Sequence, residues 1–197
     1  MIRLIFAFAL SFSTLLASAQ LIVDPTYTAQ DLTDIIVGDG IAVSNIVLNC
    51  PTGASAYFNG GGTNLNMATG VLLTSGTVAN AAMNNNDPGA SACNGAAGDP
   101  EVEGVANETT YDACILEFDI VPTCSQITFS YIFASEEYPE YVNQEFSDAM
   151  VISISGPGFV GQQNIALVPG NPIPVGIQTV NSGSFSQYYV NNAGGAT

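Results

Sequence analysis

Positively charged side chains are almost absent from this sequence. Its 197 residues contain one Lys or Arg, which is Arg3, and no His, against 17 Asp and Glu. A carboxylate that folding removes from water therefore has no side-chain cation as a partner, so it must accept backbone N–H bonds, take up a proton or bind an external cation. The usual bases for a Ser or Cys nucleophile, the Schiff-base lysine and the imidazole ligands of zinc are also missing. Only carboxylate or oxygen-ligated metal chemistry is left for catalysis.

The first 19 residues have the pattern of a secretory signal peptide. Arg3 gives a positive start, residues 4–16 are mostly apolar, and Ala17-Ser18-Ala19 supplies the small residues of a cleavage site. The apolar run is shorter than the roughly 20 residues that span a bilayer, and no later segment is long and apolar enough either. We therefore expect a mature chain of residues 20–197 that is secreted or displayed at the cell surface, with no membrane insertion after cleavage.

Cleavage leaves 17 acidic residues and no basic one, which is a formal charge of −17. This charge excludes nucleic acid as a partner, because affinity for phosphates comes from Lys and Arg. It excludes anionic membranes on the same ground. The expected partner is an extracellular protein or a glycan.

The mature chain is predicted to be one all-β domain, a jelly-roll-like β-sandwich with a short N-terminal helix. The helix is expected over residues 29–37, with Thr28 as its cap. Beyond it, short β-branched and aromatic runs alternate with Gly, Asn and Pro, which is typical of a sandwich. Strands are expected at 41–48, 55–58, 70–74, 114–121, 126–135, 149–155, 164–168, 175–180 and 187–190.

Two further features refine this fold. Apolar and polar residues alternate in 116–121 and in 126–133, and residues 122–125 have turn composition, so an antiparallel hairpin is predicted. Residues 78–107 are rich in Ala, Asn and Gly with little periodicity, which predicts a long loop. Cys93 lies in its middle and is expected to tether it.

Four cysteines in an exported chain predict two disulfides. Three pairings exist among Cys50, Cys93, Cys114 and Cys124. We favour pairing in sequence order, Cys50 with Cys93 and Cys114 with Cys124, because the second bridge would brace the two ends of the predicted hairpin.

Several short motifs of the mature chain resemble the choice-of-anchor L domain of bacterial secreted and surface proteins. They are Tyr111-Asp112, Leu116-Glu117-Phe118-Asp119, Ser135-Glu136-Glu137-Tyr138, Ser155-Gly156-Pro157-Gly158 and Asn164-Ile165-Ala166-Leu167. The resemblance implies export and varied C-terminal anchors or sorting domains, with a poorly defined molecular activity. Ser147 departs from the Asn that the family usually has before the Asp. The chain stops at Thr197 without an anchor, so we expect it to be part of a longer surface protein or to be freely released.

The acidic segment around Ser135-Glu136-Glu137-Tyr138 is the candidate site. Successive strand residues face opposite ways, so one of the two glutamates is expected to point inward. Calcium takes about six to eight oxygen ligands, including carboxylates, and is the candidate cofactor. The candidate ligands are Glu136, Glu137, Asp148, Asp99 and Asp112. The alternative is that these are solvated surface acids, with Asp112 accepting local backbone bonds as a structural residue.

These observations favour a non-enzymatic extracellular binding or adhesion module, with calcium as a stabilising ion. The alternative is a carbohydrate-active protein. Glycan binding would use aromatic stacking, for which the candidates are Tyr138, Tyr141, Tyr188 and Tyr189, although such tyrosines are more often half-buried structural residues. A glycoside hydrolase would need two carboxylates roughly 5 to 9.5 Å apart.

Overall fold

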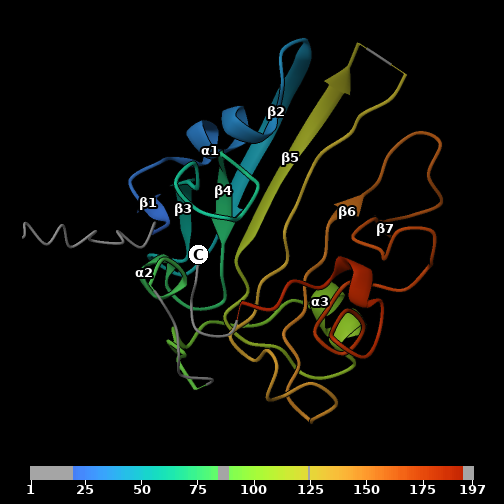
Figure 1. Cartoon of the computed structure of the whole chain (residues 1–197). Coiled ribbons are helices and arrows are strands. Elements are labelled where there is room, and N and C mark those ends of the chain that lie inside the picture. Colours follow the sequence, from blue (N-terminus) through green and yellow to red (C-terminus); the bar gives the residue numbers. More distant parts are fainter. Residues whose placement is uncertain (1–19, 84–88, 124, 193–197) are drawn as a thin grey trace, which may run out of the picture.

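The chain forms a strand-rich fold with a few short helices (Figure 1). The computed structural model describes residues 20–83, 89–123 and 125–192. The predicted signal peptide over residues 1–19 and the cysteine at position 124 lie outside the described residues. The predicted strand-rich character is confirmed, and the strands lie in small antiparallel sheets.

The described strands form three such sheets. The first has the order β1 (Ile22–Asp24), β3 (Ser55–Asn59) and β4 (Thr69–Leu73). The second pairs β2 (Ile41–Asn49) with β5 (Ile115–Pro122), and the third pairs β6 (Ser153–Ile154) with β7 (Gln163–Asn164). The strands predicted at 41–48, 55–58, 70–74 and 114–121 are therefore confirmed to within about a residue at each end.

The longest element is the β2–β5 ribbon, and it contains a bulge. One extra residue of β2 lies between the pairs Ser44–Asp119 and Val47–Glu117. Asn45 occupies the bulge with φ 53°, a conformation that Asn tolerates better than most residues, and its amide donates to Asp119 over 2.6 Å. The bulge keeps the apolar residues on its two sides on one half-buried face of the ribbon. These residues are Ile41, Val43, Ile46 and Leu48.

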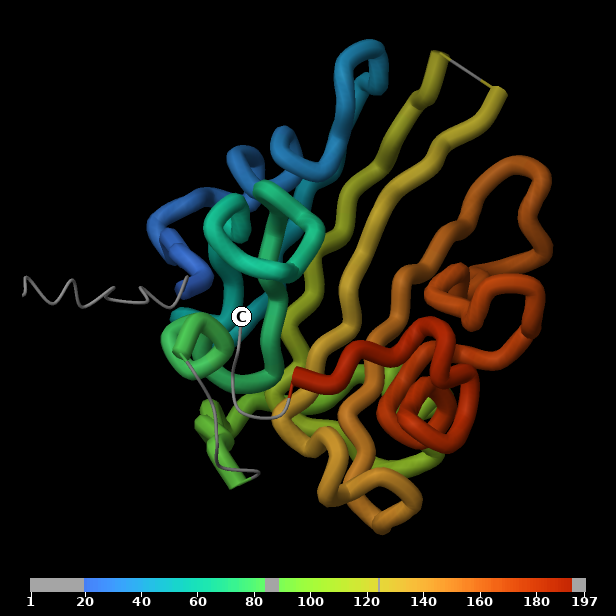
Figure 2. Tube along the Cα trace, in the orientation of Figure 1, coloured from blue at the N-terminus to red at the C-terminus, as the bar shows by residue number. Residues whose placement is uncertain are grey.

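The predicted hairpin partner of β5 is not a strand in the structure. Residues 126–135 turn back and run between β5 and the segment that leads to β6 (Figure 2), but β5 pairs with β2. Ile127 and Phe129, expected on a buried face, are 41% and 44% exposed. Local alternation marked the segment as strand-like, but alternation does not identify the neighbouring strand.

The N-terminal helix is α1 (Ala29–Ile36), and it begins where the sequence predicts. Thr28 and Asp31 form a reciprocal capping box, in which each side chain accepts the backbone N–H of the other, over 3.2 and 2.9 Å. Leu32 is fully buried beneath the helix, and Val168 and Ile177 are buried to the same degree farther along the chain. The apolar core thus draws on both halves of the sequence.

Part of the predicted long loop is helical. It contains α2 (Val78–Ala81) and α3 (Pro100–Ala106). Asp99 before Pro100 is a helix-start signal, because an Asp at the N-cap accepts backbone N–H groups and Pro fits the first turn. Four later strand predictions are also corrected. The strands predicted at 149–155 and 164–168 are reduced to the two-residue strands β6 and β7. Residues 175–180 form a turn with one isolated bridge, between Ala149 and Gly176, and the segment predicted at 187–190 begins in a 3-10 helix, η1 (Ser186–Tyr188).

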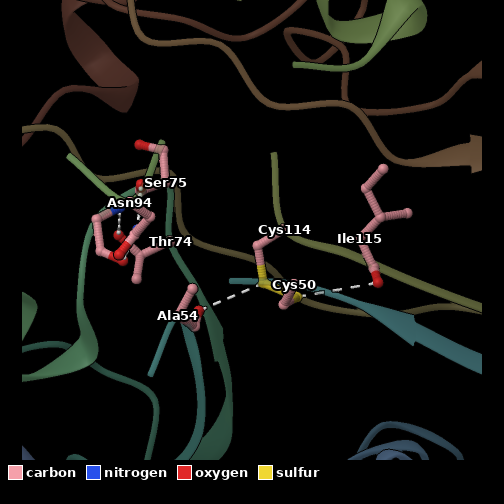
Figure 3. Close-up of a disulfide and its surroundings, with 8 residues drawn as sticks. Cys50, Ala54, Thr74, Ser75, Asn94, Cys114 and Ile115 are labelled. Atoms are coloured by element: carbon pink, nitrogen blue, oxygen red, sulfur yellow. Dashed lines mark hydrogen bonds between the residues drawn. A yellow bond between two sulfur atoms is a disulfide. The ribbon is translucent and has the colours of Figure 1, made fainter. Parts of the chain in front are cut away.

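A disulfide joins Cys50 to Cys114, so the favoured pairing was wrong (Figure 3). Cys50 follows β2 and Cys114 precedes β5, and the register Asn49–Ile115 places the two cysteines opposite each other. Strand register decides the bridge, and it cannot be inferred from cysteine order. Cys93 is free and exposed, so it does not tether the 78–107 segment through Cys50.

We predict that replacing both Cys50 and Cys114 by Ser lowers the free energy of unfolding by about 4 kcal/mol, since the bridge spans 64 residues. Denaturant titration of the mature chain measures the change. Cys93→Ser is the control and should shift stability by less than about 0.5 kcal/mol.

Peptide mapping tests the pairing directly. Trypsin has no site after Arg3, so the chain must be cut at Glu or Asp. A bridged fragment that joins Cys50 to any cysteine other than Cys114 would contradict the structure.

Candidate functional site

A hydrogen-bond network links the acidic segment to the chain that leads toward β6. Ser135 donates its hydroxyl to an Asp148 carboxylate oxygen over 2.6 Å and accepts the Glu137 N–H over 3.1 Å. The Asp148 N–H donates to Glu137 over 3.3 Å. The network holds the two carboxyl groups, those of Glu137 and Asp148, close together.

Charge repulsion and burial act together on these acids. Partial burial, followed by the repulsion of Asp148, raises the pKa of Glu137 to about 7, and Glu136 adds a smaller repulsion. Partial burial is also the main cause that raises the pKa of Glu136, and Asp148 again contributes. A carboxyl group that turns inward without a cationic side chain beside it can keep its proton, and Glu137 does so near neutral pH.

Asp112 and Asp99 lie outside this network and bind backbone donors. Asp112 is only 5% exposed and accepts the N–H groups of Asn94 and Ala96 over 2.8 and 2.5 Å. Asp99 caps α3 by accepting the Glu101 N–H over 2.8 Å. Of the five candidate calcium ligands, the structure therefore brings together Glu136, Glu137 and Asp148, and gives Asp112 the structural role that was the alternative.

The described side chains of this region do not by themselves form a metal-binding group. Among the residues that the structure describes, no group of three or more His, Cys, Asp or Glu side chains is arranged to hold a metal ion. A calcium ion at Glu137 and Asp148 would need further oxygen ligands from backbone carbonyls and water.

The four candidate tyrosines have different environments. Tyr138 is half-buried; its hydroxyl donates to the Val180 carbonyl and its ring lies 5.1 Å from that of Tyr189. Burial raises the pKa of Tyr138 to about 12. These two rings serve packing, whereas Tyr188 is exposed and Tyr141 lines a surface hollow.

Two adjoining hollows open beside the acidic segment. The larger, of about 530 Å³, is lined by Glu140, Tyr141, Asn143, Gln144, Glu145 and Phe146. The smaller, of about 160 Å³, is lined by Gly89, Ser91, Glu136, Glu137, Tyr141 and Phe146. We call the surface formed by Glu136, Glu137, Glu140, Tyr141, Glu145 and Phe146 the acidic aromatic surface.

Sequence reasoning missed two residues of this region. Phe146 is 60% exposed and lines both hollows; a single aromatic residue in a polar stretch was the available signal. Gln178 donates to three backbone carbonyls of the 141–146 loop. It lies more than 30 residues from that loop, so no local pattern identifies it.

We predict that the free energy of unfolding falls as the pH rises from about 5 to about 7.5, because Glu137 loses its proton in this range. Solvent screens the half-exposed carboxyl group of Glu137, so the expected fall is only on the order of 1 kcal/mol. Glu137 has a higher pKa in the folded chain than in the unfolded chain, so the folded state holds its proton longer and loses that advantage as the pH rises. Denaturant titrations across this range measure the slope. Glu137→Gln should remove most of it, and Glu117→Gln, an exposed control on β5, should keep it. An unchanged slope in Glu137→Gln would contradict the assignment.

Comparison with known proteins identifies the family. A family model described as the choice-of-anchor L domain matches residues 22–196. The chain therefore belongs to the choice-of-anchor L domain family. No curated protein matches the chain, and no solved structure matches it.

The family and the disulfide together indicate where the protein is located. A choice-of-anchor domain and a disulfide indicate an extracellular protein, because disulfides persist in oxidising compartments. Within residues 20–83, 89–123 and 125–192, no helix has the length and apolar character needed to cross a membrane.

Proposed function

We propose that this choice-of-anchor L domain is a non-enzymatic binding or adhesion module, secreted or held at the cell surface. The observation that carries the proposal is the acidic aromatic surface, where two hollows expose carboxylates and aromatic side chains together. Partly exposed aromatic rings beside polar groups are the composition that binding sites favour. The absence of His and Lys leaves few routes to covalent catalysis.

The proposal extends to the architecture of the whole protein. We infer that the small sheets belong to a jelly-roll-like β-sandwich, since the ribbon has one half-buried apolar face that needs a covering layer. The domain would act within a longer surface protein or after release, and its partner would be an extracellular protein or a glycan. Nucleic acid is not part of the proposal because the mature chain has no Lys or Arg.

A carboxylate-pair glycoside hydrolase is the second candidate. Glu137 favours it, because a carboxyl group with a pKa of about 7 is suited to act as a general acid near neutral pH. Glu136 or Asp148 would then serve as the second carboxylate.

We expect the mature chain to be retained on at least one surface in an array of extracellular polysaccharides and surface proteins, without releasing reducing ends. Retention and sugar release are measured in the same wells. Sugar release that disappears in Glu136→Gln or Glu137→Gln, with folding intact, would replace the binding module by the hydrolase. Retention of the wild type at no surface would reject the module.

Calcium stabilisation is a separate part of the proposal, with Glu136, Glu137 and Asp148 as carboxylate ligands. An ion that binds only the folded chain raises the melting temperature by mass action. We therefore expect a higher melting temperature in millimolar calcium than in excess chelator, and no difference in Glu137→Gln. Equal midpoints in the wild type would remove calcium from the proposal.

A further inference from the structure

We propose that the acidic aromatic surface binds a segment of a protein partner that carries several lysine or arginine side chains. The inference rests on the proposed function and narrows it, because it assigns a chemical class to the partner. Three features of the surface support it: the shape of the hollows, their charge and the way in which their backbone is held.

The two hollows share an aromatic wall. The rings of Tyr141 and Phe146 meet edge to face, with centroids 5.4 Å apart and an interplanar angle of 83°. Both residues line both hollows, and Phe146 is largely exposed. An exposed aromatic face attracts a guanidinium or ammonium group that approaches it, and a long Arg or Lys stem packs against the ring.

The charge of the surface has one sign. Glu140 and Glu145 line the larger hollow, while Glu136 and Glu137 line the smaller one. No Lys, Arg or His of the mature chain exists to offset them. A partner with several positive side chains supplies the missing complement and is steered toward the surface by the field of the whole chain.

One side chain holds the backbone of the larger hollow in place. The Gln178 amide nitrogen donates to the carbonyls of Tyr141, Gln144 and Phe146 over 3.2, 3.2 and 2.9 Å. Its amide oxygen accepts the Asn143 N–H over 2.5 Å. The loop is therefore ordered before a ligand arrives, which lowers the entropic cost of binding.

Other ligands match this surface less well. A neutral glycan would stack on the rings but would supply no positive charge to the glutamates, and an acidic glycan would be repelled. A single metal ion between Glu137 and Asp148 would leave Glu140 and Glu145 without a partner. An extended peptide with spaced cationic side chains reaches both hollows.

The test uses the mature full chain and a labelled peptide, Arg-Gly-Ser-Arg-Gly-Ser-Arg, with fluorescence anisotropy at physiological salt. We expect saturable binding that weakens at least about tenfold when citrulline, which is neutral and similar in shape, replaces arginine. Phe146→Ala and the pair Glu140→Gln with Glu145→Gln should each weaken binding about five- to tenfold. Phe146 is exposed, so its loss leaves the fold intact.

Matched controls separate this surface from diffuse attraction to an acidic protein. Asp39→Asn with Glu117→Gln removes the same charge from exposed positions before β2 and on β5, and it should change affinity less than about twofold because salt screens distant charges. Gln178→Ala alters no charge and should weaken binding about fivefold, whereas Gln162→Ala, at an exposed glutamine, should not. Equal weakening by the two charge pairs would overturn the inference.

Three results distinguish this inference from the proposed function. If the array retains the chain but the arginine peptide does not bind, the partner class is wrong and the binding module stands. If chitohexaose binds and Phe146→Ala abolishes that binding while the arginine peptide fails, the surface is a glycan site. If the array also retains nothing, the proposed function fails as well.

Discussion

The structure depends on how carboxylates are accommodated in a chain whose described residues include no Lys, Arg or His. Asp112, which is almost fully buried, accepts two backbone N–H groups, and Asp119 accepts the amide of Asn45 at the β2 bulge. Glu137 instead retains its proton to near neutral pH. Backbone N–H groups thus serve Asp112, and a side-chain amide serves Asp119. Four further carboxyl groups, those of Glu136, Glu137, Glu140 and Glu145, line the two hollows, so this surface is acidic and a cationic partner would complement it.

Prediction from the sequence succeeded where the determining interactions are local. The capping box of α1 needs only Thr28 and Asp31, and the alternation in β2 and β5 reports a half-buried face whatever the partner strand. The partner itself depends on long-range register. For this reason the pairing of β5 with β2, and the Cys50–Cys114 bridge that follows from it, could not be inferred from turn composition or from cysteine order.

The same limit applies to the candidate site. Glu136, Glu137 and Asp148 lie within 13 positions of Ser135, and Glu137 and Asp148 meet through one short network, so a local acidic motif was enough to identify them. Asp99 and Asp112 have the residue type of calcium ligands, but their carboxylates already accept hydrogen bonds from nearby backbone N–H groups. Gln178 reaches the 141–146 loop only because the fold brings together segments more than 30 residues apart. Residue type alone does not reveal such a role.

The position of the disulfide determines how the domain would carry tension between its two ends. Ile41 pairs with Pro122 at one end of the ribbon, and the bridge closes the other. A pull on the flanking chain would separate β2 from β5 one residue pair at a time and then stop at the covalent link. The 64-residue stretch behind that link would bear no load, and about 220 Å of chain would stay hidden from a stretching force. For an extracellular domain under load, this would amount to a fixed limit on extension.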